Sequence, residues 1–251
     1  MATGDVYESV AALNEYLLFH YGSEEEILPY TFGPRDALNF AVRTVSECLD
    51  LNSLPADARA FDVGCAVGRS SFELARFCRN VVGLDFSSAF VAAADALAKR
   101  GQLPYARIVC GEIVEQAVAR VPDGIDRSRV RFVQGDAGNL SEEFADFDVV
   151  HAANLLCRLP NPRSFLERLP ALVTTGGKLI LATPCTWLEA FTPKSNWLGG
   201  TDQCRDTLNR VVEVLKPAFS LEKTIDLPFL IREHERKFQW NVSQASVWQR
   251  L

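Results

Sequence analysis

The chain has 251 residues, of which 48% are hydrophobic and 23% charged, the balance of an ordinary globular protein. Its net charge of −6 argues against a broad nucleic-acid surface, because affinity for phosphate backbones comes from clustered Lys and Arg. No apolar stretch approaches the roughly 20 residues of a membrane span, and residues 1–9 lack the features of a signal peptide. We therefore expect a soluble, cytoplasmic protein with neither a nucleic-acid nor a membrane partner.

The cysteines and histidines indicate neither a disulfide scaffold nor a metal site. The sequence holds seven cysteines, an odd number, and no two of them form a Cys-x-x-Cys pair. The three histidines lie far apart, without the spacing of metal ligands. We expect reduced thiols and no bound metal.

Two helices are predicted before the first strand. Apolar residues recur at helical spacing over residues 7–21 and again over 36–49, with a Pro- and Gly-containing loop between them. The segment 54–57 contains a proline and is a natural break. We expect a single domain over 1–251, in which 1–54 form an N-terminal helical cap and 55–251 form the core.

The core segment alternates strands with helices. Short apolar runs predict buried strands at residues 60–64, 80–85, 130–133, 147–151 and 178–182. Helices are predicted between and after them, at residues 70–78, 88–100, 164–172 and 202–215. Residues 101–128 are too long for a tight connection and predict an inserted hairpin or helix, and two further strands are expected at 219–227 and 238–248. This alternation predicts an α/β fold, with a mainly parallel sheet covered by helices on both faces and an antiparallel edge.

One glycine-containing turn carries the expected chemistry. Asp62-Val63-Gly64-Cys65-Ala66-Val67-Gly68 follows the first predicted strand and opens a helix. Its small residues let the backbone approach a ligand closely, beyond the carboxyl ends of the strands. Asp85 ends the next strand, where an acidic side chain can bind ribose hydroxyls. The pattern predicts a site for a cofactor that contains a nucleoside.

Two cofactor classes use this layout, and the spacing separates them. Nicotinamide enzymes require G-x-G-x-x-G, whereas the sixth position counted from Gly64 is Arg69. The turn resembles instead the D-x-G-x-G-x-G motif of class I methyltransferases, with Ala66 in place of the middle glycine. Matching segments follow in order at residues 135–137, 147–154 and 176–179. The resemblance implies a Rossmann-like, seven-stranded fold with S-adenosyl-L-methionine as cofactor and S-adenosyl-L-homocysteine as product.

The resemblance also implies roles for particular residues. Asp85 is expected to bind the ribose, Asp136 the adenine amine, and the Ala137 amide a ring nitrogen. Asn154 and Leu155 are expected beside the sulfonium, while Asp62 either binds the cofactor amino group through water or orders the turn. The expected cofactor-binding residues are Asp62, Gly64, Cys65, Ala66, Gly68, Asp85, Phe86, Gly135, Asp136, Ala137, Asn154 and Leu155.

Several segments resemble a narrower family. Residues 13–22, the block from Leu28 to Phe40, and Arg43 are similar, together with the cofactor motif, to the C-terminal methyltransferase domain of ovothiol synthases. That family methylates the π nitrogen of the imidazole of 5-thiohistidine (4-mercaptohistidine) to give ovothiol A. Because the domains that form the carbon–sulfur bond are absent, the resemblance implies either a stand-alone N-methyltransferase or an excised domain that works with a sulfoxide synthase.

A neutral imidazole already carries a lone pair, so the enzyme needs mainly to fix its tautomer and aim the correct nitrogen. We expect a hydrogen bond to the other ring nitrogen and a cationic group for the substrate carboxylate. Arg43 could serve the cofactor carboxylate instead, and Tyr30 and Phe32 could be lid packing. The expected substrate-binding residues are Tyr30, Phe32, Arg35, Asn39, Arg43 and Trp187. The expected catalytic residues are Asn154, Tyr30 and Asn39.

Other functions stay open at this point. They are a methyltransferase for another small molecule, a cofactor-binding module without activity, a nicotinamide dehydrogenase and a base methyltransferase. The base methyltransferase is disfavoured because residues 154–157 lack the N/D-P-P-Y run of many enzymes that methylate base amino groups, and because the chain is acidic.

Overall fold

The computed structural model describes residues 7–50 and 54–251. Its α-helices include α1 (Val10–Tyr21), α2 (Glu24–Ile27), α3 (Phe40–Ser46), α4 (Arg69–Leu74), α5 (Ser88–Arg100), α6 (Pro162–Leu172) and α7 (Thr207–Leu215). Its strands include β1 (Arg59–Val63), β2 (Asn80–Asp85), β3 (Gln102–Cys110), β4 (Ile113–Arg120), β5 (Val130–Gln134), β6 (Phe147–Ala153), β7 (Val173–Thr183), β8 (Phe219–His234) and β9 (Lys237–Arg250).

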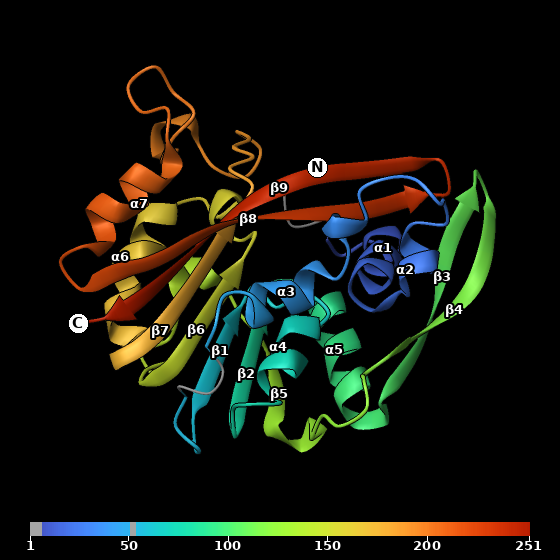
Figure 1. The fold of residues 1–251 in the computed structure, drawn as a ribbon, viewed down its shortest axis with the longest axis horizontal. Helices are drawn as coiled ribbons and strands as arrows, with labels where there is room; N and C mark the ends of the chain where they lie inside the picture. Colours follow the sequence, from blue (N-terminus) through green and yellow to red (C-terminus); the bar gives the residue numbers. More distant parts are fainter. Residues whose placement is uncertain (1–6, 51–53) are drawn as a thin grey trace.

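The main sheet has seven strands in the order β5-β2-β1-β6-β7-β9-β8 (Figure 1). The strands from β5 to β7 pair in parallel, whereas β9 is antiparallel to both β7 and β8. This is the Rossmann-like, mainly parallel sheet with an antiparallel edge that the sequence predicts. The chain order reverses between β1 and β6, and open α/β sheets bind their ligands beyond the strand ends at such a point.

Helices cover both faces of the sheet, so its strands are buried on both sides (Figure 1). Val81 and Val82 are neighbours in β2, yet Val81 packs in the cluster with α4 and α5 and Val82 in the cluster with α6 and α7. Successive side chains of a strand point to opposite faces, which explains the continuous apolar runs seen in the sequence. None of the helices within 7–50 and 54–251 is long and apolar enough to span a lipid bilayer.

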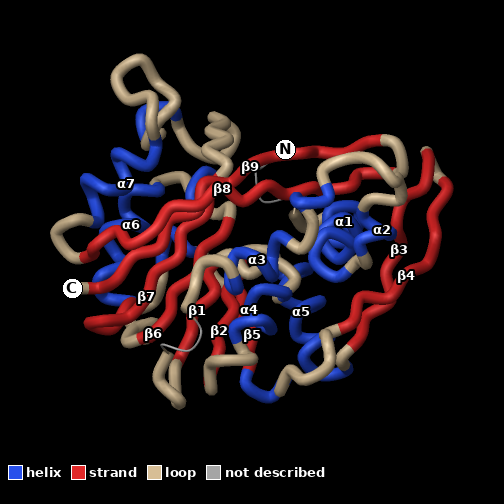
Figure 2. Tube along the Cα trace, viewed as in Figure 1, coloured by secondary structure: helices blue, strands red, loops and turns tan. Residues whose placement is uncertain are grey.

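The insertion at residues 101–128 contains an antiparallel hairpin, β3–β4, one of the two forms expected. The final strands are longer than predicted, because β8 continues to His234 and β9 begins at Lys237. Their outer halves leave the sheet as a ribbon, residues 228–242, which runs towards α1 and the hairpin (Figure 2). The ribbon and hairpin meet where the Glu235 amide donates to the Val109 carbonyl at 3.2 Å.

The helices predicted at 36–49 and 202–215 begin later than expected. The helix predicted at 36–49 is a short 3-10 turn, Arg35–Ala37, followed by α3, because Asn39 adopts a left-handed backbone (φ 58°) between them. The helix predicted at 202–215 begins only at Thr207, where the Asp206 side chain accepts from the Leu208 amide and caps the helix. The start of each helix thus depends on one residue, which interrupts the predicted helix in the first case and caps the helix in the second.

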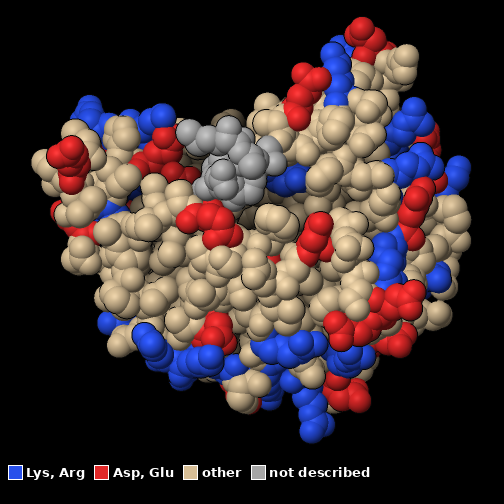
Figure 3. Space-filling view, turned by 180° about the vertical axis from the view of Figure 1, so that it is seen from behind, with Lys and Arg blue, Asp and Glu red and all other residues tan. Residues whose placement is uncertain are grey.

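The surface carries charges of both signs. On the face seen in Figure 3, basic and acidic side chains lie next to one another along the lower rim, around a large neutral area. No broad field of one sign covers that face, in line with the moderate net charge of −6.

Candidate active site

The turn after β1 folds back tightly onto β2. The amides of Gly64 and Cys65 both donate to the Leu84 carbonyl, at 2.7 and 3.0 Å. Gly64 and Gly68 have positive φ angles of 76° and 85°, and Ala66 has one of 47°, at the position of the middle glycine in the class motif. A Cβ atom at Gly68 would lie 2.5 Å from the Phe132 ring. The turn therefore needs glycine at both ends and exposes its backbone beyond the sheet.

Asp85, the last residue of β2, holds this turn. One carboxylate oxygen accepts from the Ala66 amide at 2.8 Å and the other from the Ser87 amide at 2.9 Å. Burial raises the pKa of Asp85 to about 6, although these two hydrogen bonds act in the opposite direction. The carboxylate therefore lies in a poorly solvated place where further hydrogen-bond donors from a ligand would stabilise its charge.

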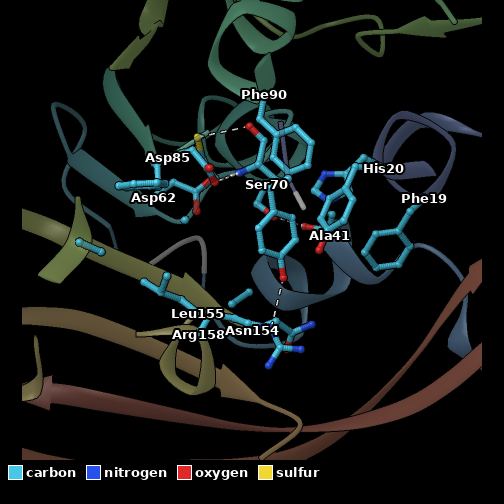
Figure 4. A pocket seen from close by; sticks show the side chains of 18 of the residues that line it. Phe19, His20, Ala41, Asp62, Ser70, Asp85, Phe90, Asn154, Leu155 and Arg158 are labelled. Carbon is cyan, nitrogen blue, oxygen red and sulfur yellow. Dashed lines mark hydrogen bonds between the residues drawn. The ribbon is translucent and has the colours of Figure 1, made fainter. Parts of the chain in front are cut away.

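A cavity of about 740 Å³ lies beyond the carboxyl ends of the parallel strands, within the usual range of ligand sites (Figure 4). We call the lining residues at the ends of β1, β2, β5 and β6 the floor, and those of α1, α3, β8 and β9 the roof. The floor comprises Asp62, Gly64, Cys65, Ala66, Leu84, Asp85, Phe86, Gly135, Asp136, Ala137, His151, Ala153, Asn154 and Leu155. The roof comprises Ala12, Glu15, Tyr16, Phe19, His20, Phe40, Ala41, Phe229, Ile231, Gln239 and Asn241.

The floor brings together every residue expected to bind the cofactor, with the exception of Gly68. Gly68 begins α4 instead, packed against Phe132, and serves the shape of the turn. In Figure 4, Asp62 and Asp85 lie on one side of the cavity, opposite Phe19 and His20 from α1. The contacts of these floor residues with a cofactor stay predictions.

The residues expected to bind the substrate lie elsewhere: none of Tyr30, Phe32, Arg35, Asn39, Arg43 and Trp187 lines the cavity. The ribbon explains this difference. Tyr30 contacts the ring of Phe238, whereas the neighbouring Gln239 lines the cavity. Because adjacent residues of a strand point to opposite faces, Tyr30 packs on the outer face of the ribbon, whereas Phe40 and Ala41 of the same block belong to the roof. Within residues 30–43 the cavity lining includes Phe40 and Ala41, but none of the residues expected to bind the substrate.

The side chains of these residues are engaged with protein groups or with solvent. Arg35 donates to the Tyr30 carbonyl at 2.9 Å, and the Asn39 amide donates to Glu24 at 3.1 Å. Arg43 pairs with Glu47 at 2.6 Å and also donates to the Pro228 carbonyl. Phe32 is 72% exposed. Trp187 is buried, and its indole donates to the Thr207 hydroxyl at 3.1 Å.

Sequence reasoning missed the residues of the roof, above all those of α1. The apolar residues that predict this helix are Val10, Leu13, Leu17 and Leu18. Ala12, Glu15, Tyr16 and Phe19 follow the same helical spacing on another face, and they line the cavity. This second stripe is aromatic and acidic rather than aliphatic, and it was the feature of the sequence that could have indicated a cavity-lining face of the helix.

A buried network fixes the end of β1. The two carboxylate oxygens of Asp62 lie 2.7 Å from His151 Nδ1 and 2.5 Å from the Ser71 hydroxyl. The other ring nitrogen of His151 lies 3.0 Å from the Thr44 hydroxyl on α3. Both carboxylate oxygens of Asp62 are thus engaged with protein groups of α4 and β6, and His151 is a buried histidine with a partner at each ring nitrogen.

Asn154, at the end of β6, is held in a defined orientation. Its backbone is left-handed (φ 56°), and its amide donates to the Ala182 carbonyl at 2.7 Å. The Ser243 hydroxyl donates to the side-chain oxygen of Asn154 at 2.6 Å. This bond leaves the NH₂ group of Asn154 available as a donor on the cavity wall.

The charged side chains of Arg158 and Glu15 lie on the cavity wall outside any ion pair among the described residues. Arg158 donates to the Tyr7 hydroxyl at 3.2 Å and the Thr186 carbonyl at 3.0 Å, and it lies over the Phe191 ring. It forms no ion pair with a carboxylate among the residues that the structure describes. Glu15 has neither a hydrogen bond nor an ion pair in the same part of the chain, and burial raises its pKa. Lys237 acts on the pKa of Glu15 in the opposite direction without forming an ion pair, so the wall offers a cation and a carboxylate that are both open to a ligand.

The floor fits S-adenosylmethionine. Carboxylates at the ends of β2 and β5 can accept from ribose hydroxyls and from an adenine amine, and the turn at 64–66 brings backbone within reach of the methionine part. The seventh residue of the turn motif, Gly68, keeps the helix close to the sheet, as the motif requires.

The comparisons agree with this site. Residues 61–181 match the model of a protein family described as a methyltransferase domain. No curated protein matches the sequence of the chain. Together with the fold and the floor residues, the family match identifies the chain as an S-adenosylmethionine-dependent methyltransferase of the Rossmann-like class, and S-adenosylmethionine is its cofactor.

Solved structures share the fold at low sequence identity. Magnesium protoporphyrin IX methyltransferase from Synechocystis PCC 6803, with bound SAH, is 18% identical with a TM-score of 0.56, covering 96% of each chain. The N-methyltransferase NodS from Bradyrhizobium japonicum WM9 is 15% identical with a TM-score of 0.52, covering 84% of this chain and 96% of its own. The [4+2]-cyclase SpnF is 18% identical with a TM-score of 0.57, covering 89% of this chain and 74% of its own. The acceptor must therefore be argued from the site and not from the fold.

Proposed function

We propose that this methyltransferase transfers a methyl group to the π nitrogen of the imidazole of 5-thiohistidine, giving ovothiol A. The resemblance of residues 13–43 and of the cofactor motif to the ovothiol synthase methyltransferase domain supports the proposal. The observation that carries it is that Arg158 and Glu15, which form no ion pairs with the described residues, lie on the wall of a cavity lined in part by aromatic side chains.

A charged group without a partner is costly in a poorly solvated place, so a ligand that supplies the opposite charge gains affinity. Arg158 can bind a carboxylate, and Glu15 an ammonium group. A free amino acid carries both. Tyr16, Phe19 and Phe40 on the roof offer apolar surface for a flat ring. A zwitterion with a small aromatic ring, such as 5-thiohistidine, matches this combination.

The residues of the chain act here by holding and orienting. S-adenosylmethionine would supply an electrophilic methyl group to the ring nitrogen. The methylated ring then loses its remaining N–H proton to water. Arg158 and Glu15 fix the amino-acid part of the acceptor, and the NH₂ group of Asn154 donates to the bound ligands near the reacting atoms. Alignment of nucleophile and methyl group supplies much of the acceleration, and no strong general base is required.

Mass spectrometry tests the proposal directly. The protein is incubated with S-adenosylmethionine and 5-thiohistidine, with histidine and thiol-containing amino acids as competing acceptors. We expect one added methyl on 5-thiohistidine, and fragmentation that locates it on the ring nitrogen next to the side chain. Methylation of sulfur, or turnover of another acceptor without turnover of 5-thiohistidine, would contradict the proposal.

A further inference from the structure

His20, on the cavity-facing side of α1, is an imidazole without a hydrogen-bond partner. Neither ring nitrogen bonds to any residue that the structure describes, and Nδ1 is also shielded from solvent. The ring lies among aromatic neighbours, with centroids 5.9 Å from Tyr16 and 5.1 Å from Phe19. Because protein encloses Nδ1, the ring nitrogen that a ligand in the cavity can reach is Nε2, and a ligand is expected to supply its missing partner.

The order of strands indicates which part of a ligand lies below His20. Asp136 follows β5, Asp85 ends β2 and Gly64 follows β1, and these strands are consecutive in the sheet. If Asp136 binds the adenine and Asp85 the ribose, the next group along the floor is the methionine part, beyond β1. The neighbouring Tyr21 hydroxyl donates to the Val67 carbonyl at 2.8 Å, which holds the end of α1 above this same turn. His20 therefore faces the amino-acid end of the cofactor.

The methionine carboxylate needs a donor there, and the other candidates are engaged. Arg69 is paired with Glu73 at 2.8 Å. Arg43 lies outside the cavity lining, with Glu47 and the Pro228 carbonyl as partners. Arg158 follows β6 and is oriented by Tyr7 and Thr186, further along the floor. His20 is left as a side chain of the methionine end with an unused N–H group.

We propose that the imidazole of His20 binds the α-carboxylate of the methionine part of the cofactor. The charged and titratable groups around it are Asp62 on β1, Arg69 on α4, and Tyr16 and Tyr21 on α1. Burial lowers the pKa of His20 to about 3, so the ring is neutral near pH 7 and binds as a hydrogen-bond donor. The proposal concerns binding of the cofactor and not of the acceptor. It can therefore fail while the assignment to 5-thiohistidine stands.

Calorimetry with two ligands tests it in the full chain. S-adenosylhomocysteine carries the amino-acid group, whereas 5′-methylthioadenosine keeps the nucleoside and the thioether but lacks the carboxylate. We expect His20→Phe to weaken S-adenosylhomocysteine roughly 10- to 100-fold, the range of a hydrogen bond to a charged group, and to leave 5′-methylthioadenosine unchanged. His20→Gln keeps a donor and is expected to recover part of the loss.

Asn14→Ala is the matched control, because Asn14 lies on the same helix and its side chain accepts from the Ala106 amide of the hairpin, outside the cavity lining. Both affinities should stay unchanged in this variant. An equal loss for both ligands in the His20 variants would indicate a general effect on the cavity and overturn the proposal. So would an unchanged affinity for S-adenosylhomocysteine together with a higher KM for the acceptor. If His20→Phe does not fold, the same comparison with His20→Gln decides.

Discussion

The carboxylate of Asp85 is subject to two opposing influences. Burial raises its pKa from 3.8 to about 6, while the amides of Ala66 and Ser87 stabilise the charged form. Because the folded-state pKa lies above the unfolded value, this carboxyl favours the fold at low pH, and that contribution is lost as the pH rises through about 6. Ribose hydroxyls would supply donors to the charged form and offset this cost.

The affinity for S-adenosylhomocysteine should therefore depend on pH. We expect it to rise as Asp85 ionises, through about pH 6, and to level off above about pH 7. Asp85→Asn should bind at least roughly tenfold more weakly near pH 7.5 and should lose this rise, since it has no carboxyl to titrate. Titration calorimetry between about pH 5 and pH 8 measures both. Equal affinity of the native protein at the two ends of this range would contradict the role of Asp85.

The roles of Arg158 and Glu15 can be separated from cofactor binding. Arg158→Met and Glu15→Gln should each raise the KM for 5-thiohistidine by roughly 10- to 100-fold, because each removes a charge-assisted contact with the acceptor. Affinity for S-adenosylhomocysteine should stay within about twofold of the native value. Arg163→Met serves as the control, because Arg163 is exposed and pairs only with Glu167. Unchanged acceptor KM in both variants would refute these contacts.

At the scale of the elements, the turn between β1 and α4 tolerates little substitution at its glycines. Gly68 has a φ of 85° and no room for a Cβ, whereas Gly111, at the tip of the β3–β4 hairpin, has a φ of 56° and nothing within 4 Å of the added atom. Gly68→Ala should lower the free energy of unfolding by about 2–4 kcal/mol and abolish measurable cofactor binding. Gly111→Ala should cost about 1 kcal/mol and leave binding intact. Chemical denaturation and calorimetry measure the two effects, and similar losses for both variants would contradict this account.

The network around Asp62 joins β1 and β6 to α3 and α4. Asp62→Ala leaves the His151 ring and the Ser71 hydroxyl without their buried partner, so we expect a loss of about 3–5 kcal/mol in the free energy of unfolding. Asp95→Ala, which removes an exposed ion pair with Lys99, should cost less than about 1 kcal/mol. Urea unfolding of the three proteins measures this. A loss below about 1 kcal/mol in Asp62→Ala would show that the network contributes little.

The elements of the core were predictable because local patterns determine them. The apolar run at 60–64 and the glycines that follow it require a buried strand and a tight turn, whatever the rest of the chain does. The roof was less predictable, because it depends on contacts between distant segments. The pattern of residues 219–227 gave no reason to extend β8 to His234, which is held by its pairing with β9 and by contacts with α1 and α2. The substrate-binding residues expected between Tyr30 and Arg43 were misplaced because resemblance assigns residues but not the face of the ribbon on which they lie.

In the whole molecule, the floor, where the cofactor nucleoside is expected, lies opposite a roof that is built mainly from the N-terminal helix α1 and the C-terminal strands β8 and β9. The sequence predicted the floor, since its residues lie within a few positions of strand ends, and strand ends of a parallel sheet meet at one edge. It did not predict Arg158 or Glu15, because whether a charged side chain forms an ion pair depends on its surroundings in the folded chain. The cofactor site thus depends on local motifs, whereas the proposed acceptor site depends on contacts between distant segments.

The most direct test is a crystal structure of the protein with S-adenosylhomocysteine and 5-thiohistidine. The account predicts the ribose hydroxyls on the carboxylate of Asp85, the acceptor carboxylate on Arg158, and the π nitrogen of the ring turned towards the cofactor sulfur. A nucleoside bound away from Asp85, or an acceptor whose imidazole points away from that sulfur, would contradict it.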